Sequence, residues 1–87
     1  ASLLTGGKRK NATLEPAVLA DVPPTAQVAC REAFGPVVGI NSYESLDQAI
    51  AMVNDSQYGL QAGIYTRDIQ KAFRAARKVH VGGFMIN

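Results

Sequence analysis

The 87-residue chain contains no tryptophan and has only one cysteine, Cys30, and one histidine, His80. A single cysteine excludes a disulfide within the chain, and such low cysteine usage fits a reducing, cytoplasmic setting. One histidine and one cysteine, with no partner nearby in the sequence, cannot supply the four ligands of a structural zinc site. Disulfide scaffolds and zinc centres are therefore excluded as explanations of this chain.

Charged residues are also scarce, at 18% of the sequence, and the net charge is only +2. This balance excludes an acidic tail and does not require a polyanionic partner. No apolar run approaches the roughly 18 residues of a membrane-spanning helix, so we expect no membrane association. An apolar share of 47% is nevertheless too high for a disordered segment. The length then allows one small domain or, as the lack of an initiator methionine favours, a piece of a longer protein.

Residues 1–34 carry no sustained hydrophobic period, and we expect an irregular or extended leading segment. Residues 6–11 predict an exposed polar turn, because they lack the spacing of a phosphate-binding loop. Residues 13–19 predict an extended stretch in which Pro16 removes one ladder donor, which favours an edge position or an irregular strand. A short helix is expected over residues 26–30.

Residues 35–87 show a clearer alternation of apolar and capping residues. The pattern predicts a strand over 36–43, a helix over 45–54, a strand over 60–65, a second helix, and a last strand over 84–86. Helical connections between short apolar strands imply parallel pairing with right-handed crossovers. We therefore expect an α/β fold in which residues 35–87 form a βαβαβ unit with parallel strands.

Both predicted helices have readable caps and apolar faces. Ser45 followed by Gln48 has the spacing of a capping box, and residues 66–68 supply candidate caps for the second helix. Two consecutive glycines, at 82 and 83, are expected to end that second helix. The apolar stripes predict buried faces formed by Leu46, Ile50 and Val53 on the first helix and by Ile69, Phe73 and Ala76 on the second.

Cys30 and His80 are the first candidates for catalysis, but neither has the surroundings that catalysis requires. A nucleophilic thiol needs a base, a cation or a helix N-terminus to become a thiolate, and the neighbouring Arg31 would point away from Cys30. A small apolar filler is the favoured interpretation of Cys30. His80 is expected on the last turn of the second helix, where it favours the negative end of the dipole. We assign no catalytic residue to this chain.

The second helix carries five of the nine basic residues, opposed only by one aspartate: Arg67, Lys71, Arg74, Arg77 and Lys78. Such a face can bind phosphate groups or nucleic acid. No aromatic residues are interleaved for base stacking, so a solvated outer face is the favoured interpretation. We expect no nucleic-acid partner.

An acid and an aromatic residue, Glu32 and Phe34, stand directly before Gly35-Pro36 and the first clear strand. A carboxylate at this place could accept hydrogen bonds from two hydroxyl groups, as ribose recognition requires. In an extended segment Phe34 would point to the same side as Glu32. The alternative is an ordinary turn before a strand, with Phe34 in the core.

Residues 32–38 (EAFGPVV) resemble the E-x-F-G-P-V signature of NAD(P)-dependent aldehyde dehydrogenases. Residues 16–22, 49–68 and 81–87 are similar to further segments of that family, including its N-D-[ST]-x-Y-G-L stretch. The spacing is family-like over nearly the whole chain. The chain thus resembles the C-terminal part of the catalytic domain of these enzymes.

The resemblance implies a parent enzyme that oxidises an aldehyde to a carboxylic acid with NAD or NADP, through a cysteine thioester. Glu32 matches the family glutamate that holds the nicotinamide-ribose hydroxyls, Phe34 matches the phenylalanine beside that ribose, and Leu60 matches a position near the nicotinamide. The family's nucleophilic cysteine, general-base glutamate and dinucleotide-binding domain have no counterpart in this sequence, so the isolated chain is expected to be inactive. The resemblance also implies a homo-oligomer and, as a partner of this segment, the rest of the parent chain.

A different class of function is a stand-alone α/β interaction module without chemistry, which would self-associate through exposed strand edges. The reading frame around the chain distinguishes the two hypotheses, since an upstream cysteine motif and dinucleotide domain would support the enzyme. The aldehyde, and the choice between NAD and NADP, do not follow from these residues.

Overall fold

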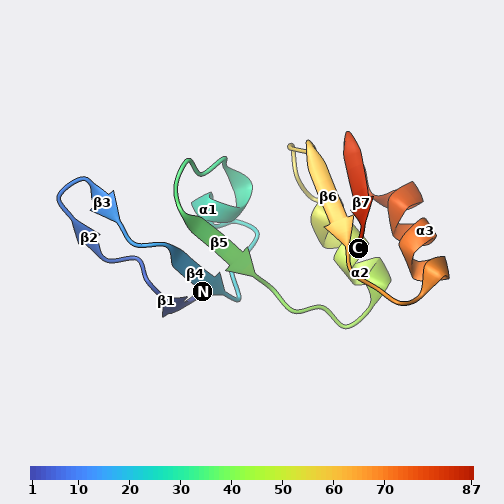
Figure 1. Cartoon of the computed structure of the whole chain (residues 1–87), viewed down its shortest axis with the longest axis horizontal. Helices are drawn as coiled ribbons and strands as arrows, with labels where there is room; N and C mark the ends of the chain where they lie inside the picture. The colour runs from blue at the N-terminus through green and yellow to red at the C-terminus, as the bar shows by residue number, and fades with distance from the viewer. The chain divides into compact units, whose positions relative to one another are not determined.

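The computed structural model describes the whole chain, residues 1–87, as two compact units, residues 1–42 and residues 43–87 (Figure 1). The first unit contains β1 (Ser2–Thr5), β2 (Arg9–Lys10), β3 (Thr13–Leu14), β4 (Ala17–Ala20), α1 (Gln27–Cys30) and β5 (Val37–Ile40). The second unit contains α2 (Leu46–Asn54), β6 (Gln61–Ile64), α3 (Ile69–Lys78) and β7 (Gly83–Ile86).

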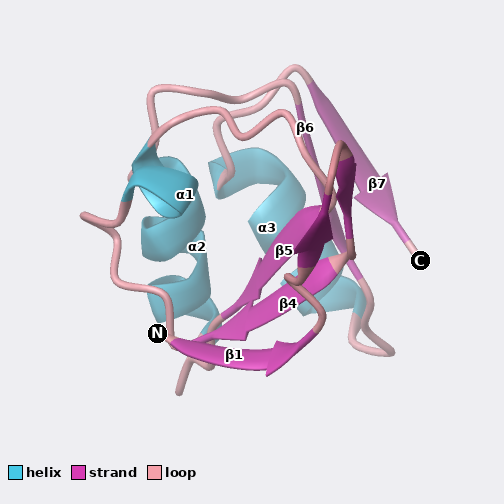
Figure 2. Cartoon of the chain, turned by 90° about the vertical axis from the view of Figure 1, so that its left-hand side faces the viewer, coloured by secondary structure: helices cyan, strands magenta, loops and turns pink.

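A three-stranded sheet organises the first unit, with β4 between β1 and β5 (Figure 2). β4 pairs antiparallel with β1 and parallel with β5, from Ala17 opposite Val37 to Ala20 opposite Ile40. β2 and β3 form a separate antiparallel hairpin, with a positive φ of 55° at Asn11 in its turn. The short helix expected near residues 26–30 is confirmed as α1, which connects β4 to β5.

Pro16 lies between β3 and β4 rather than inside a strand. The parallel ladder begins one residue later, where the Ala17 amide donates to the Pro36 carbonyl over 2.8 Å. The prediction of an irregular strand is confirmed by this break. The expected edge position is wrong, because a proline outside the paired residues removes no bond from the ladder of a central strand.

In the second unit, β6 and β7 pair in parallel and α3 connects them, with Ala62 opposite Phe84 and Ile64 opposite Ile86. The predicted α/β class and the order strand, helix, strand, helix, strand are confirmed. Within the first unit β5 pairs with β4, and within the second β6 pairs with β7. The pairing of β5 with β4 was not predicted, because residues 13–19 were expected only as an irregular or edge stretch, whereas β4, α1 and β5 form a parallel crossover. That residues 35–87 act as one βαβαβ unit within a longer chain stays a prediction.

The capping box predicted for α2 is present. The Ser45 hydroxyl accepts a bond from the Gln48 amide over 3.2 Å, and the Gln48 side-chain oxygen accepts one from the Glu44 amide over 2.6 Å. The return bond therefore reaches the residue before the cap rather than the cap itself. The bond to Ser45 satisfies the Gln48 amide, which the first helical turn leaves without an intrahelical partner, and the return bond satisfies an amide that lies outside the helix.

Asp68 caps α3, as predicted, by accepting bonds from the Gln70 and Lys71 amides over 2.9 and 3.1 Å. The predicted end of the helix at glycines 82 and 83 is wrong. α3 ends at Lys78, Val79 is extended (φ −81°, ψ 126°), and His80 lies outside the helix. The cause is a tertiary partner, because the amide side chain of Asn54 bonds the backbone of the two residues that flank Val79, over 2.8 Å in each case.

The buried face of α3 consists of Ala72 and Ala75, each 2% exposed. Ile69 and Phe73 are 70% and 51% exposed, so their predicted burial is wrong for this chain. Phe73 follows Ala72 by about 100° around the helix axis and therefore leaves the face that packs inward. On α2, the predicted burial of Ile50 is confirmed, at 7% exposure, Leu46 is only partly buried, and the predicted burial of Val53 is wrong, at 47% exposure.

The chain buries little apolar surface overall. Val22 is the one large apolar side chain buried in the first unit, whereas Val38 and Ile40 on β5 are 52% and 53% exposed. Parallel strands are normally covered on both faces, so these exposed side chains lack the covering that such strands usually have. The longest helix, α3, has ten residues, and no helix in the structure combines the length and hydropathy needed to cross a membrane.

Candidate functional site

Glu32 and Phe34 lie on the loop between α1 and β5, and both side chains are exposed. The ring of Phe34 is 95% exposed, which excludes the alternative that it belongs to the core of this unit. Two backbone bonds fix the end of this loop: the Ala17 amide donates to the Pro36 carbonyl over 2.8 Å, and the Val37 amide donates to the Gly35 carbonyl over 2.9 Å. A carboxylate and an aromatic ring therefore project from a loop that is anchored to the sheet.

Leu60, the third residue predicted for the site, directly precedes β6 in the second unit and is 84% exposed. Its carbonyl accepts a bond from the Gly83 amide over 3.1 Å, and the carbonyl of Gly59 accepts one from the Gly82 amide over 2.9 Å. The backbone of Leu60 is thus held against the start of β7, while its side chain stays exposed.

The three predicted residues are divided between the two units, but they share one feature. Glu32 and Phe34 precede the amino end of β5, and Leu60 precedes the amino end of β6. All three combine a fixed backbone nearby with an exposed side chain, which suits contact with a group outside this segment. Their placement differs from the common rule that open α/β sheets bind ligands at the carboxyl ends of their strands.

Cys30 is exposed at the end of α1, so its interpretation as a buried apolar filler is wrong for this chain. Its sulfur lies 3.8 Å from the Thr25 carbonyl oxygen. A backbone carbonyl is neither the base nor the cation that activates a nucleophilic thiol. The surroundings of Cys30 therefore do not resemble those of an activated cysteine.

The basic residues of α3 are exposed, and one of them has a partner within the unit. Arg74 donates to both carboxylate oxygens of Asp47 over 2.5 and 2.7 Å, which joins α3 to the first turn of α2. An ion pair at such exposed positions contributes little to stability, of the order of 1 kcal/mol or less. This contact favours the interpretation that the basic face of α3 is a solvated outer face, with one ion pair that connects α3 to α2.

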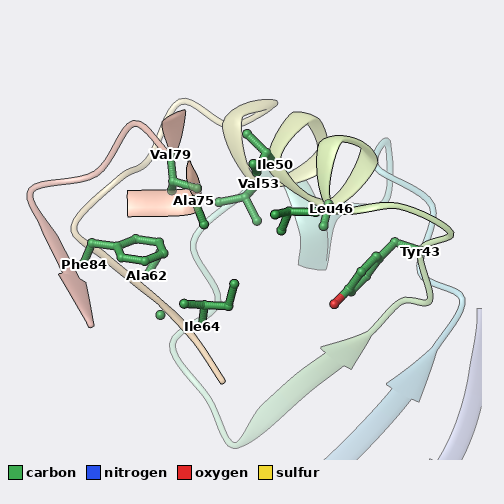
Figure 3. Close-up of a pocket in the computed structure, with 11 residues that line it drawn as sticks. Tyr43, Leu46, Ile50, Val53, Ala62, Ile64, Ala75, Val79 and Phe84 are labelled. Atoms are coloured by element: carbon green, nitrogen blue, oxygen red, sulfur yellow. The ribbon is translucent and has the colours of Figure 1, made fainter. Parts of the chain in front are cut away.

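An apolar pocket of about 180 Å³ lies between α2, α3 and one face of the β6–β7 pair, and side chains from all four elements line it (Figure 3). Tyr43 carries the one polar side-chain group among its lining residues, so the polar chemistry of the pocket is limited to a single hydroxyl. It is an incompletely filled interior. Its lining residues are Tyr43, Leu46, Ala49, Ile50, Val53, Ala62, Gly63, Ile64, Ala75, Val79 and Phe84.

Sequence reasoning missed two asparagines that extend the parallel ladders. Asn41 follows β5 and bonds both backbone groups of Val22, over 2.7 Å to the amide and 3.0 Å to the carbonyl. Asn87 follows β7 and bonds Thr66 in the same way, over 2.9 and 3.1 Å. In each case the partner stands two residues after the neighbouring strand. The available signal was an asparagine directly after an apolar strand that ends in isoleucine.

Comparison with known proteins identifies the family of this chain. The aldehyde dehydrogenase family matches residues 1–87, the whole chain. A 3-sulfolactaldehyde dehydrogenase from Priestia aryabhattai is 46% identical over 87 residues, which are 100% of this chain and 18% of that protein. A lactaldehyde dehydrogenase from Methanococcus maripaludis is 41% identical over 85 residues, covering 98% of this chain and 18% of that relative.

Solved structures agree with the sequence comparison. The structure of aldehyde dehydrogenase 21 from Physcomitrella patens, in complex with the product succinate, matches with a TM-score of 0.94 and 47% identity, over 98% of this chain and 18% of that chain. A 1-pyrroline-5-carboxylate dehydrogenase from Thermus with bound NAD matches with a TM-score of 0.89 and 36% identity, over 97% of this chain and 17% of that one. The chain belongs to the aldehyde dehydrogenase family, and it spans about 18% of the length of the relatives it matches.

Proposed function

We propose that this chain is a segment of the catalytic domain of an NAD(P)-dependent aldehyde dehydrogenase, which oxidises an aldehyde to a carboxylic acid through a cysteine thioester. The segment supplies part of the site for the nicotinamide ribose. The observation that carries the proposal is the anchored loop with exposed Glu32 and Phe34, in a chain whose whole length matches the family. Solved relatives with bound NAD support the choice of coenzyme.

The residues present fit such a coenzyme. The two oxygens of the Glu32 carboxylate can each accept a bond from one hydroxyl of a ribose, a charge-assisted contact stronger than a neutral one. Phe34, which is 95% exposed, offers an aromatic ring, and Leu60 offers an exposed apolar side chain. NAD or NADP, when bound, would accept the hydride from the substrate. The role of these three residues is to hold and orient the ribose and the nicotinamide.

The same proposal assigns the chemical step to other parts of the parent chain. Cys30 is not assigned as its nucleophile, because the Thr25 carbonyl that contacts its sulfur is neither the base nor the cation that activation requires. The isolated 87-residue chain should therefore form no NAD(P)H from an aldehyde. We also propose, from the family, a cytoplasmic homo-oligomer whose substrate is a small aldehyde.

The experiment compares full-length parent enzyme carrying Glu32→Gln or Phe34→Ala with the unchanged enzyme, by pre-steady-state hydride transfer and by labelling of the active-site thiol. Loss of a charge-assisted hydrogen bond should slow hydride transfer about 10–100-fold in Glu32→Gln. Phe34→Ala should also slow it, because the ring that limits movement of the nicotinamide is gone. Thiol labelling should be unchanged in both variants.

Glu15→Gln is the matched control, since it removes the same charge from an exposed position in the same unit, outside the proposed site. Its hydride-transfer rate should equal that of the unchanged enzyme. If Glu32→Gln and Phe34→Ala also transfer hydride at that rate, both residues are structural and the proposed site is wrong.

A further inference from the structure

Two segments of the second unit, residues 54–60 and 78–83, cross and bond to each other. Asn54, the last residue of α2, is half-buried, and its side-chain amide donates to the Lys78 carbonyl over 2.8 Å. Its side-chain oxygen accepts a bond from the His80 amide, also over 2.8 Å. One side chain thus bonds the Lys78 carbonyl, one of those that a helix leaves without an intrahelical partner at its end, and the His80 amide just beyond the helix.

The two segments remain paired beyond this amide. The Gly82 amide donates to the Gly59 carbonyl over 2.9 Å, and the Gly83 amide donates to the Leu60 carbonyl over 3.1 Å. A Cβ atom on Gly59 would lie only 2.8 Å from the His80 carbonyl oxygen, a distance that real Cβ atoms do not adopt. The close approach of the two backbones therefore requires glycine at position 59.

This crossing sets the position of Leu60. With its side chain 84% exposed, packing within the unit contributes little to where that side chain lies. Its location depends on the backbone, and the backbone is held by the bonds that begin at Asn54 and end at Leu60 itself. Loss of the Asn54 side-chain amide would leave residues 78–80 without their side-chain partner. The backbone that sets the position of Leu60 would then be held less firmly.

We propose that Asn54 is a positioning residue for the coenzyme site, acting through Leu60. The inference rests on the proposed function, in which Leu60 contacts the nicotinamide. Asn54 does not touch the coenzyme itself. It holds the side chain of Leu60 in place through the end of α3 and the start of β7.

The test is a double-mutant cycle in the full-length enzyme, with Asn54→Asp and Leu60→Ala singly and together. Asn54→Asp keeps the acceptor for His80 but places an oxygen against the Lys78 carbonyl. The measurement is the Kd of NAD by titration, with thermal unfolding and thiol labelling recorded in parallel. Asn54→Asp should raise the Kd about 5-fold, as expected when the donor of a hydrogen bond is removed.

The double mutant shows whether Asn54 acts on the Kd through the position of Leu60 or through a general loss of stability. When Leu60 is already alanine, adding Asn54→Asp should raise the Kd less than about 2-fold, because residues that act as a unit are not additive. A full further 5-fold increase would show that Asn54 does not act through Leu60 and would overturn the inference. An unchanged Kd in Asn54→Asp alone would overturn it as well.

Asn87→Asp is the matched control, because it removes the corresponding donor to the Thr66 carbonyl at the other end of the β6–β7 pair. It should lower thermal stability without raising the Kd, and a Kd raised equally by both substitutions would contradict the proposal.

If Asn54→Asp does not fold, Asn54→Ser retains one donor and one acceptor and replaces it in the same double-mutant cycle. If Leu60→Ala alone leaves the Kd unchanged while Glu32→Gln slows hydride transfer, the role of Leu60 and this inference fail together, and the proposed ribose site stands.

Discussion

At the scale of single residues, Gly6 shows how backbone geometry dictates residue choice. Gly6 has a φ of +73°, and a Cβ atom there would lie 1.6 Å from the Pro16 carbonyl oxygen. Gly7 also has a positive φ, +80°, but a Cβ atom there would meet only side-chain atoms of Leu3 and Ala17, at 3.5 Å or more. A side chain at Gly7 would thus meet only the energetic penalty of a positive φ, whereas one at Gly6 would also collide with the backbone.

We predict that Gly6→Ala lowers the free energy of unfolding of the full-length protein much more than Gly7→Ala. Gly7→Ala should cost about 1–2 kcal/mol, the penalty of a left-handed conformation for an L-residue. Gly6→Ala adds a backbone collision to that penalty and should cost at least about 3 kcal/mol. Denaturant unfolding of both variants is the measurement, and equal losses would contradict the close contact with Pro16.

Local residue signals were readable from the sequence, and long-range ones were not. The caps at Ser45 and Asp68 were predicted because donor and acceptor lie within three residues of each other. The paired side-chain bonds that Asn41 and Asn87 make to the backbone join residues 19 and 21 positions apart. No local pattern specifies such partners, so these asparagines could be found only in the folded chain.

At the scale of elements, α3 shows where hydrophobic periodicity was insufficient. The apolar stripe predicted one buried face, and its large residues Ile69 and Phe73 are exposed at 70% and 51%. The structure buries Ala72 and Ala75 instead, at 2% exposure each. Small side chains permit close packing of the helix, a property that a count of large apolar residues does not detect. The end of α3 was missed for a related reason, since Asn54 in another helix replaces the bonds that would continue it.

We predict that Ala72→Leu destabilises the full-length protein by about 1–3 kcal/mol, because added methylene groups have no room in a closely packed interface. The matched control is Ala51→Leu, which makes the same change at an exposed position on α2. That substitution should change stability by no more than about 0.5 kcal/mol. Thermal and denaturant unfolding measure both, and a neutral Ala72→Leu would show that the buried face of α3 has been misplaced.

At the scale of the whole molecule, exposed apolar side chains in both units indicate a segment that is covered by something else. Val38 and Ile40 on β5, and Met85 on β7, are each more than half exposed. Because the chain spans about 18% of the length of its relatives, we propose that the rest of the parent chain covers these strands. The α/β class was predictable from the hydrophobic pattern, and the family from its resemblance to known motifs. The pairing of β5 with β4 was not, since strand order depends on which partners are present.

The central claim, that this segment forms one wall of the nicotinamide-ribose site, is tested most directly by a crystal structure of the full-length parent with NAD bound. The account predicts that the two carboxylate oxygens of Glu32 accept hydrogen bonds from the two hydroxyls of the nicotinamide ribose, at about 2.5–3.0 Å. The ring of Phe34 should lie against the same ribose. A structure in which the Glu32 carboxylate contacts neither hydroxyl, with NAD fully bound, would contradict the account.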